Sequence, residues 1–134
     1  MSAKIVKNAS EWQRTLDAPT FHVTRERGTE TAFTGRYWNT KTPGLYRCAC
    51  CGQALFDSST KYDSGTGWPS FWSPVAADAV TTRKEPGWWR RRTEVICSGC
   101  DAHLGHVFTD GPKPTGQRYC LNSAALTLEP RSGK

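Results

Sequence analysis

Two pairs of cysteines are the residues of this sequence best suited to bind a metal ion. Each pair has the spacing C-x-x-C: the first is Cys48 with Cys51, and the second is Cys97 with Cys100. Zn²⁺ prefers four thiolates in a tetrahedron, and a tight turn with this spacing directs two sulfurs at one ion. Two such turns fill the coordination shell and leave no open position. We therefore predict one structural zinc ion per chain.

Other arrangements of these cysteines compete with the zinc site. The four residues could form two disulfides or lie unligated in the core. A single segment could also supply the ligands, because Cys97, Cys100, His103 and His106 recur every three residues. That site would leave the first pair unused. A catalytic zinc ion has little support, because the chain lacks both the H-E-x-x-H and the H-x-E motif.

Cys120 lies outside both pairs and is the candidate nucleophile. Arg118 is two residues away, on the same face of an extended strand. A nearby guanidinium favours the nucleophilic thiolate over the thiol. A buried, inert cysteine in a strand fits the same residues, so the local sequence leaves both interpretations open. The sixth cysteine, Cys50, is either a passive neighbour of the metal ligands or a partner thiol for an oxidised Cys120.

A turn rich in glycine and proline, Asp110–Gly116, separates two strand-like segments and predicts a β-hairpin. Symmetric pairing about the centre of this turn places Phe108 opposite Arg118 and His106 opposite Cys120. A slip of one residue would separate these side chains, so the register decides whether they can form a site. The two-residue period of a strand gathers five side chains on one face: His106, Phe108, Arg118, Cys120 and Asn122.

The elements that would position these residues are short. A capping box at Ser10–Gln13 predicts a helix through Leu16, and a second helix is expected from Pro19 to Gly28. Beyond Gly35, turn-forming residues alternate with strand-forming ones. We therefore expect a mainly β fold of antiparallel sheets with short N-terminal helices at the periphery. The predicted strands are Arg36–Thr40, Leu45–Arg47, Phe71–Val75, Trp88–Ile96, Leu104–Thr109, Gln117–Leu121 and Ala125–Leu128.

The composition fits one domain spanning residues 1–134, with an ordered core at about 10–128 and flexible termini. The chain has 134 residues, of which 37% are hydrophobic and 22% charged, and it is too aromatic to be disordered. No apolar stretch approaches the ~20 residues that a membrane-spanning helix needs, and the N-terminus carries no apolar signal segment. We expect a cytoplasmic protein without a membrane partner, in which cysteines serve metal or thiol chemistry more often than disulfides.

Two other functions compete with an enzyme. The net charge of +6 and the basic segment Arg83–Arg92, which includes Trp88 and Trp89, would suit a zinc-ribbon-like nucleic-acid-binding module. That interpretation gives Cys120 no role, and arginines alternating along an exposed strand explain the same segment, so we expect no nucleic-acid partner. The other alternative is a redox-sensing zinc protein, in which oxidation of Cys120 is a signal without turnover.

In its motifs and their order the sequence resembles the B-type methionine sulfoxide reductases, which reduce the R epimer of methionine sulfoxide. The resemblance extends from about Arg14 to Leu128. It implies a single methionine-R-sulfoxide reductase domain of two packed antiparallel sheets with short peripheral helices. The segments that carry it are Gly28–Glu30, Gly35–Trp38, Tyr46–Gly52, Phe56–Asp57, Lys61–Trp72, Glu94–Gly111 and Arg118–Ala125.

The resemblance also implies roles for individual residues. It makes Cys120 the catalytic cysteine and the four paired cysteines the zinc ligands. One position departs from many members of the family: Thr66 stands where they have a resolving cysteine, which leaves the recycling route open. The residues that match the lining of the family's sulfoxide pocket are Trp68, His103, His106, Phe108, Arg118 and Asn122.

The expected reaction is the thiol-dependent reduction of methionine-R-sulfoxide, in oxidised proteins or as the free amino acid, as protein repair under oxidative stress. The Cys120 thiolate attacks the sulfur, and either histidine protonates the oxygen. Arg118 would stabilise the thiolate unless it pairs with Asp110, and Asn122 would orient an imidazole. Trp68 would offer an apolar wall and an N–H donor. A thioredoxin-type dithiol would then reduce the sulfenic acid, directly or through the sixth cysteine.

Overall fold

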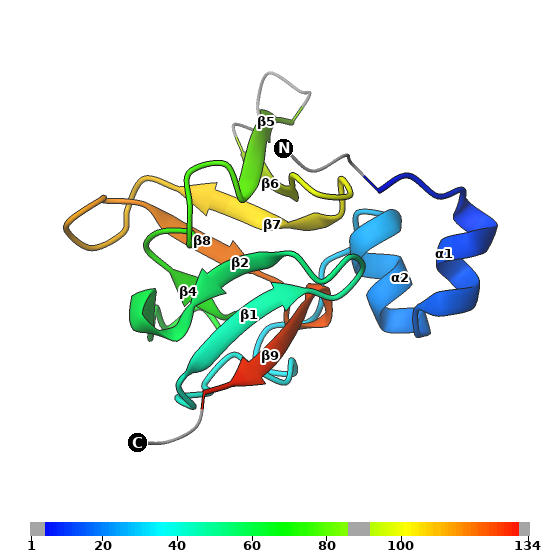
Figure 1. Cartoon of the computed structure of the whole chain (residues 1–134). Helices are drawn as coiled ribbons and strands as arrows, with labels where there is room; N and C mark the ends of the chain where they lie inside the picture. Colours follow the sequence, from blue (N-terminus) through cyan, green and yellow to red (C-terminus); the bar gives the residue numbers. More distant parts are fainter. Residues whose placement is uncertain (1–4, 86–91, 132–134) are drawn as a thin grey trace.

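The computed structural model describes residues 5–85 and 92–131 (Figure 1). In these residues the chain forms two α-helices and then nine β-strands in two antiparallel sheets, which confirms the predicted mainly β fold. The smaller sheet has the order β2-β1-β9, with β1 at Gly44–Cys48, β2 at Ala54–Asp57 and β9 at Leu126–Pro130. The larger sheet has the order β3-β4-β8-β7-β6-β5. Its strands are β3 (Lys61–Tyr62), β4 (Ser70–Phe71), β5 (Val80–Lys84), β6 (Thr93–Cys97), β7 (His103–Phe108) and β8 (Arg118–Leu121).

The first helix, α1 (Ala9–Thr15), begins two residues before its predicted start. The Asn8 side chain accepts a hydrogen bond from the Glu11 backbone amide, and the Glu11 carboxylate accepts one from the Asn8 amide. These reciprocal bonds form the capping box, so the box predicted at Ser10–Gln13 is wrong. The helix ends at Thr15, beside the predicted end at Leu16.

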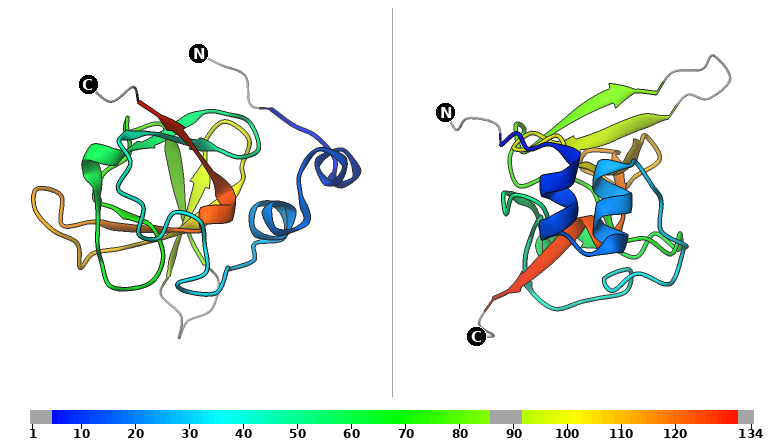
Figure 2. Two further views of the ribbon diagram at one scale, coloured as in Figure 1. Left: turned by 90° about the horizontal axis from the view of Figure 1, so that it is seen from below. Right: turned by 90° about the vertical axis from the view of Figure 1, so that its right-hand side faces the viewer.

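The second helix, α2 (Ala18–Arg25), lies beside α1 at one end of the molecule and packs against β7 and a 3₁₀ turn, η2 (Ser123–Ala125) (Figure 2). Asp17 caps its first turn by accepting a hydrogen bond from the Thr20 amide. The helix stops short of the predicted end at Gly28. Helix α2 therefore packs against β7, the strand that carries both candidate histidines.

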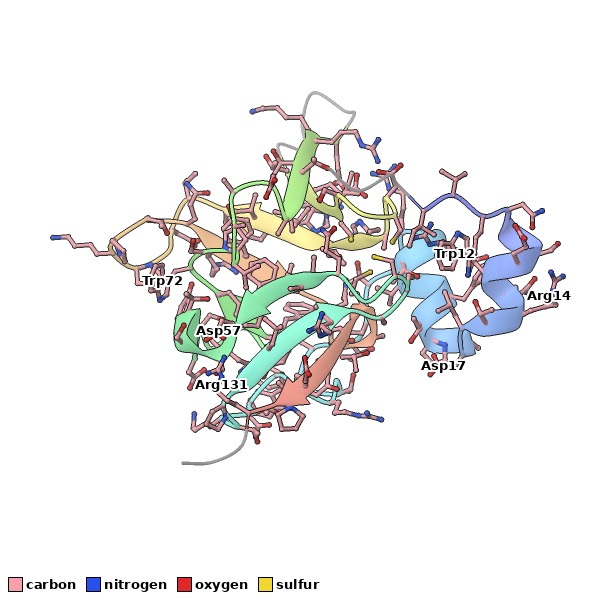
Figure 3. All side chains as sticks on the ribbon, in the orientation of Figure 1. Trp12, Arg14, Asp17, Asp57, Trp72 and Arg131 are labelled. Carbon is pink, nitrogen blue, oxygen red and sulfur yellow. The ribbon has the colours of Figure 1, made fainter. Side chains whose placement is uncertain are left out.

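Trp12 joins the helices to the strands (Figure 3). Its side chain is 2% exposed, and the Arg25 guanidinium lies 4.2 Å from its ring centroid. Arg25 also donates a hydrogen bond to the carbonyl oxygen of Cys100 at 3.0 Å. The helical layer is thus connected directly to one of the predicted metal ligands.

Six of the seven predicted strands overlap an observed strand. The segment Phe71–Val75 is reduced to its first residue in β4, and the first half of Trp88–Ile96 lies outside the described residues. The seventh segment, Arg36–Thr40, is wrong because it forms turns. The Tyr37 backbone amide there donates to the Ser123 hydroxyl at 3.0 Å, which replaces a neighbouring strand as its partner. Strands β2, β3 and β5 were not among the predictions.

Aromatic side chains from both sheets form the core between them. The ring of Phe71 in β4 lies 5.1 Å from that of Tyr46 in β1 and 4.7 Å from that of Phe56 in β2. Tyr119 of β8 packs on Phe56 at 5.5 Å. Large buried rings contribute strongly to the hydrophobic free energy of a core. This cluster therefore fixes β8, the strand that carries Cys120, against the smaller sheet.

The far end of the smaller sheet is closed by an ion pair between Asp57, the last residue of β2, and Arg131, which follows β9 (Figure 3). The Arg131 amide also donates to the Pro43 carbonyl at 2.8 Å. No helix in residues 5–85 and 92–131 is long and apolar enough to span a membrane. Of the termini predicted to be flexible, residues 1–4 and 132–134 lie outside the described residues, whereas 5–9 and 129–131 are described, with α1 beginning at Ala9 and β9 continuing to Pro130.

Candidate metal centre and active site

The two cysteine pairs lie in turns that end strands of different sheets. Cys48 is the last residue of β1, and its carbonyl accepts a hydrogen bond from the Gly52 amide at 2.9 Å. Cys97 is the last residue of β6, and its carbonyl accepts one from the Asp101 amide at 2.9 Å. Gly52 has a φ of 82°, a left-handed conformation that glycine adopts without strain. The turns bring four sulfur atoms within 4.8 Å of one another: those of Cys48, Cys51, Cys97 and Cys100.

The spacing of these sulfurs fits a tetrahedral metal ion. The Sγ atoms of Cys48 and Cys100 are 3.7 Å apart, and so are those of Cys51 and Cys97. A tetrahedron with Zn–S bonds of about 2.3 Å has edges of about 3.8 Å. A disulfide needs about 2.05 Å, and all six cysteines are free, so the disulfide alternative is wrong. The donor set is four thiols, the set that a closed zinc site uses.

Hydrogen-bond donors surround the sulfur atoms and offset the negative charge of thiolates. Hydrogen bonds among the four thiols also lower the pKa of three of them and raise that of Cys48. A cation binding here would displace the shared protons. The outer donors are the Cys50 amide to Cys48 Sγ at 3.4 Å, the Gly99 amide to Cys97 Sγ at 3.3 Å and Arg25 Nη2 to Cys100 Sγ at 3.1 Å.

Cys50 is held beside the metal cluster. Its Sγ donates to the Thr24 hydroxyl of α2 at 3.3 Å, and its backbone amide bonds to Cys48. It does not line the cavity that contains Cys120. These contacts are those of a passive neighbour, one of the two roles predicted for it.

The β7–β8 hairpin has the predicted register: Phe108 pairs with Arg118, and His106 with Cys120. Gly105 allows the strands to approach, because a Cβ there would lie 2.2 Å from the Cys120 carbonyl oxygen. The half-buried Cys120 opens into a cavity of about 320 Å³. Its lining is Thr29, Thr66, Trp68, Arg92, Gly105, His106, Phe108, Arg118, Cys120 and Asn122.

The structure separates the two candidate histidines. His106 lines the cavity, and its Nε2 is 2.8 Å from Glu85 Oε2. His103 does not line the cavity: it is 3% exposed, and its Nδ1 is 2.6 Å from Glu94 Oε2. The rings remain neighbours, with centroids 5.5 Å apart. The prediction that both histidines line the pocket is therefore corrected to His106 alone, and the interpretation of both rings as metal ligands is wrong.

The two carboxylates that orient the imidazoles are joined by arginines. Arg27 Nη2 lies 2.8 Å from Glu94 Oε1 and 3.7 Å from Glu85 Oε2. Arg83 contacts Glu94 at 3.4 Å, and Arg92 contacts Glu85 at 3.1 Å. Arg83 and Arg92, which the nucleic-acid interpretation would assign to phosphates, thus have carboxylate partners. Glu94 is 1% exposed, and a buried carboxylate needs such compensation.

Burial and these ion pairs determine which of the groups beside His106 are charged. Burial raises the pKa of Glu85, but the hydrogen bond with His106 and the nearby Arg92 guanidinium lower it by more, so Glu85 is ionised at neutral pH. Burial lowers the pKa of His103 by more than its hydrogen bond with Glu94 raises it. His103 is accordingly neutral near pH 7, and its buried Nε2 has no partner among the described atoms.

Arg118 has two partners other than Cys120. Its Nε and Nη2 donate to the two carboxylate oxygens of Asp110 at 2.8 Å and 3.2 Å, as the alternative prediction proposed. The pairing lowers the pKa of Asp110. The guanidinium also lies over the Phe108 ring at 4.3 Å from its centroid. Asp110 and Phe108 therefore hold the Arg118 charge in place at the edge of the cavity.

Trp68 and Asn122 have backbone partners that the sequence analysis missed. Trp68 Nε1 donates to the Glu30 carbonyl at 3.0 Å, so its expected N–H donor is already engaged. Asn122 donates to the Leu104 carbonyl at 3.1 Å and accepts from the Glu30 amide at 3.0 Å. The role of Asn122 in orienting an imidazole is therefore corrected: its side chain ties the loop that carries Glu30 to β7 of the hairpin.

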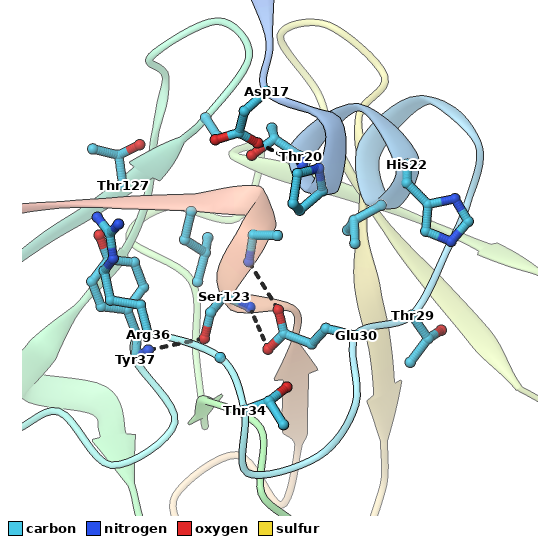
Figure 4. Close-up of a pocket in the computed structure, with 16 residues that line it drawn as sticks. Asp17, Thr20, His22, Thr29, Glu30, Thr34, Arg36, Tyr37, Ser123 and Thr127 are labelled. Carbon is cyan, nitrogen blue, oxygen red and sulfur yellow. Dashed lines mark hydrogen bonds between the residues drawn. The ribbon is translucent and has the colours of Figure 1, made fainter.

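Glu30 anchors this region from a second cavity, of about 460 Å³ (Figure 4). Its carboxylate accepts hydrogen bonds from the backbone amides of Ser123 at 2.9 Å and Ala124 at 3.0 Å. Both amides open η2, which directly follows Asn122. The carboxylate thus holds the segment that directly follows β8.

Residues 16–130 match the family described as SelR domain, so the chain belongs to this family. It is 55% identical over 126 residues to the peptide methionine sulfoxide reductase MsrB of Acinetobacter baylyi, covering 94% of this chain and 91% of that protein. It is 57% identical over 129 residues to the MsrB protein of Pseudomonas aeruginosa, covering 96% and 98%. These findings confirm the resemblance on which the predicted fold and site rest.

Plant relatives are longer than this chain. Peptide methionine sulfoxide reductase B1, chloroplastic, of Arabidopsis thaliana is 57% identical over 119 residues, which are 89% of this chain. The chain spans 59% of that protein's length and 56% of the corresponding protein of Oryza sativa subsp. japonica.

Proposed function

We propose that this protein is a peptide-methionine (R)-S-oxide reductase that returns methionine-R-sulfoxide to methionine in oxidised proteins, with the free sulfoxide as a second substrate. The observation that carries the proposal is the opening of the Cys120 sulfur into a cavity that also holds His106, Trp68 and Phe108. A nucleophile, a proton donor and two apolar rings are the groups that sulfoxide reduction needs. The names of the relatives support the same activity.

The reaction begins with attack of the Cys120 thiolate on the substrate sulfur. His106, bound to Glu85 through Nε2, donates a proton to the sulfoxide oxygen. The oxygen passes to Cys120, methionine leaves, and the cysteine becomes a sulfenic acid. Arg118 is paired with Asp110, which offsets part of its charge, so it adds only a weakened electrostatic attraction to the negative sulfur.

The walls of the cavity explain a preference for one epimer. Trp68 and Phe108 offer apolar surface to the S-methyl group, while His106 presents its donor elsewhere on the cavity wall. The wrong epimer would place its oxygen against a ring and leave a buried polar group unpaired. Each unpaired group costs about 1–3 kcal/mol, which is roughly a tenfold to hundredfold preference.

A thioredoxin-type dithiol restores the enzyme in this proposal. Its first thiolate displaces the sulfenic oxygen as water and forms a mixed disulfide, and its second thiol releases Cys120. Direct reduction is favoured over a route through Cys50, because Cys50 is bonded to Thr24 beside the metal cluster. A protein with six free thiols suits the reducing cytoplasm, which we propose as its location.

The proposed metal is one zinc ion held by Cys48, Cys51, Cys97 and Cys100. Four thiolates fill a tetrahedral shell, so the ion supplies structural cross-linking and no open coordination position for substrate. The residues of the chain then carry all of the chemistry at Cys120.

The decisive experiment is an assay of both methionine sulfoxide epimers with dithiothreitol, comparing the wild type with Cys120→Ser. We expect turnover of the R epimer by the wild type and at least a thousandfold loss in the variant, because the nucleophile is gone. The control is Cys50→Ser, which should retain turnover if reduction is direct. Equal rates for wild type and Cys120→Ser would overturn the proposal.

A further inference from the structure

Three hydroxyl groups form a continuous chain that ends at the Cys120 sulfur. The Ser70 and Ser64 oxygens are 2.7 Å apart, and the Ser64 and Thr66 oxygens are 2.8 Å apart. The Thr66 oxygen then lies 3.7 Å from Cys120 Sγ, within hydrogen-bond distance for sulfur. Ser64 and Thr66 belong to the loop that leads from β3 into β4, and Ser70 is the first residue of β4. Ser70 is fully buried and pairs with Cys120 across β4 and β8.

Backbone groups hold these oxygens in place. The Thr66 amide points to Ser64 Oγ at 3.4 Å, and the Trp68 amide points to Thr66 Oγ1 at 3.4 Å. Ser70 Oγ donates to the Trp68 carbonyl at 3.1 Å. Gly65 and Gly67 have φ values of 75° and 89°, which let the loop fold back on itself. The chain is therefore built into the loop rather than formed by mobile side chains.

We propose that this hydroxyl chain reverses its hydrogen bonds with the protonation state of Cys120 and that Thr66 donates to the thiolate. Each hydroxyl has one proton to donate and two lone pairs to accept. When Cys120 is a thiol, the S–H donates to Thr66, Thr66 to Ser64, Ser64 to Ser70, and Ser70 to the Trp68 carbonyl. When Cys120 is a thiolate, Ser70 donates to Ser64, Ser64 to Thr66, and Thr66 to the sulfur.

Both arrangements keep Thr66 and Ser64 fully hydrogen-bonded. In each, the Thr66 oxygen accepts the Trp68 amide and one further donor, while its own proton goes to the remaining neighbour. Ser64 does the same with the Thr66 amide. In the thiolate arrangement Ser70 gives up its bond to the Trp68 carbonyl. The proton that Cys120 loses passes to solvent in the cavity, and the three hydroxyls keep their protons and rotate. A neutral donor that turns toward a charge as it forms stabilises that charge without a fixed cation.

This inference deepens the proposed function, since it takes Cys120 as the reactive thiol. It gives a task to the residue that stands in the place of the family's second thiol: Thr66 supports the nucleophile through a hydrogen bond. Ser64 and Ser70 are positioning residues that act through Thr66.

The test measures the nucleophile without any sulfoxide. The rate at which iodoacetamide alkylates Cys120 is followed against pH in the metal-loaded protein, by mass spectrometry of the peptide that contains it. Thr66→Val has nearly the same shape but no hydroxyl. We expect its alkylation rate at pH 7 to fall about fivefold and its pH profile to move to higher pH, since fewer molecules carry the thiolate. Thr66→Ser restores the donor and should restore the profile.

Two further variants distinguish the loss of the hydrogen bond from a general effect on folding. Ser64→Ala keeps Thr66 but breaks the chain, and it should move the pH profile in the same direction by about half as much. Thr82→Val removes an exposed hydroxyl of β5 and should change nothing. A wild-type alkylation profile in both Thr66→Val and Ser64→Ala overturns the inference, whatever their turnover. A variant that loses sulfoxide turnover but keeps the wild-type alkylation profile would also count against the hydroxyl-chain inference. A shifted alkylation profile in a protein that reduces no sulfoxide would refute only the proposed function.

Discussion

The two histidines of β7 each have a carboxylate partner but differ in their surroundings. His103 is buried and bonds to the buried Glu94, whereas His106 lines the cavity and bonds to Glu85. A carboxylate on one ring nitrogen fixes the orientation of the ring. In the proposed reaction His106 is therefore the histidine placed to deliver a proton, and His103 packs beside it.

Replacing Glu85 by Gln should lower kcat about tenfold while changing KM little, because the amide no longer stabilises the protonated His106 during proton transfer. The measurement is steady-state reduction of methionine-R-sulfoxide at a single pH, from which kcat and KM are obtained separately for the variant and the wild type. Glu129→Gln is the matched control, since Glu129 pairs with Arg47 on the exposed face of the smaller sheet. A variant at position 85 with wild-type kcat would remove this carboxylate from the mechanism.

At the scale of elements, the β7–β8 hairpin determines which side chains meet. Its register joins His106 to Cys120 and Phe108 to Arg118, and Gly105 keeps the two backbones close. The hairpin is held from the other side by Ser70, which pairs with Cys120.

Gly105→Ala should destabilise the protein by about 1–3 kcal/mol and reduce turnover, because the new Cβ would meet the Cys120 carbonyl oxygen at 2.2 Å and push β8 away. Urea unfolding gives the free energy, and the dithiothreitol assay gives the rate. Gly116→Ala is the comparison: its Cβ meets nothing within 4 Å, so its only penalty is a φ of 73°, about 1 kcal/mol, and turnover should be retained. Equal effects of the two substitutions on the free energy of unfolding and on turnover would show that the close approach of β7 and β8 at Gly105 is not required.

The local pattern of the sequence predicts this hairpin because a single turn between two strands fixes their register. The cysteine pairs are predicted for a similar reason, since each pair lies within one turn. Glu85 and Glu94 could not be found in this way: they reach the histidines only through the pairing of β5, β6 and β7, and β5 was not predicted. The turns at Arg36–Thr40 were missed because Ser123, far along the chain, supplies the hydrogen bond that replaces a strand.

At the scale of the whole molecule, the four-cysteine cluster joins the two sheets. Cys48 ends β1 of the smaller sheet, and Cys97 ends β6 of the larger one. The other large contact between the sheets is the aromatic cluster around Phe71. A bound ion would therefore hold the sheets together at one side of the core, while hydrophobic contacts hold them together in the middle.

Removing the metal with a chelator should lower the melting temperature by at least about 10 °C, because binding of a structural ion contributes directly to folding free energy. Metal content by mass spectrometry and thermal unfolding by circular dichroism measure the two quantities on the same sample. Cys51→Ser should give the same low melting temperature, and Cys50→Ser, which removes a thiol outside the cluster, should keep the metal. A metal-free protein as stable as the loaded one would show that the cluster does not hold the sheets together.

Three of the four clustered sulfurs belong to buried residues, while Cys51 is only half-buried. Peroxide or hypochlorous acid approaching from solvent therefore reaches Cys51 before the other three sulfurs, and oxidation there would break the link between the sheets first. For a chain proposed to work under oxidative stress, the lifetime of the folded state then depends on how long this one thiol stays reduced.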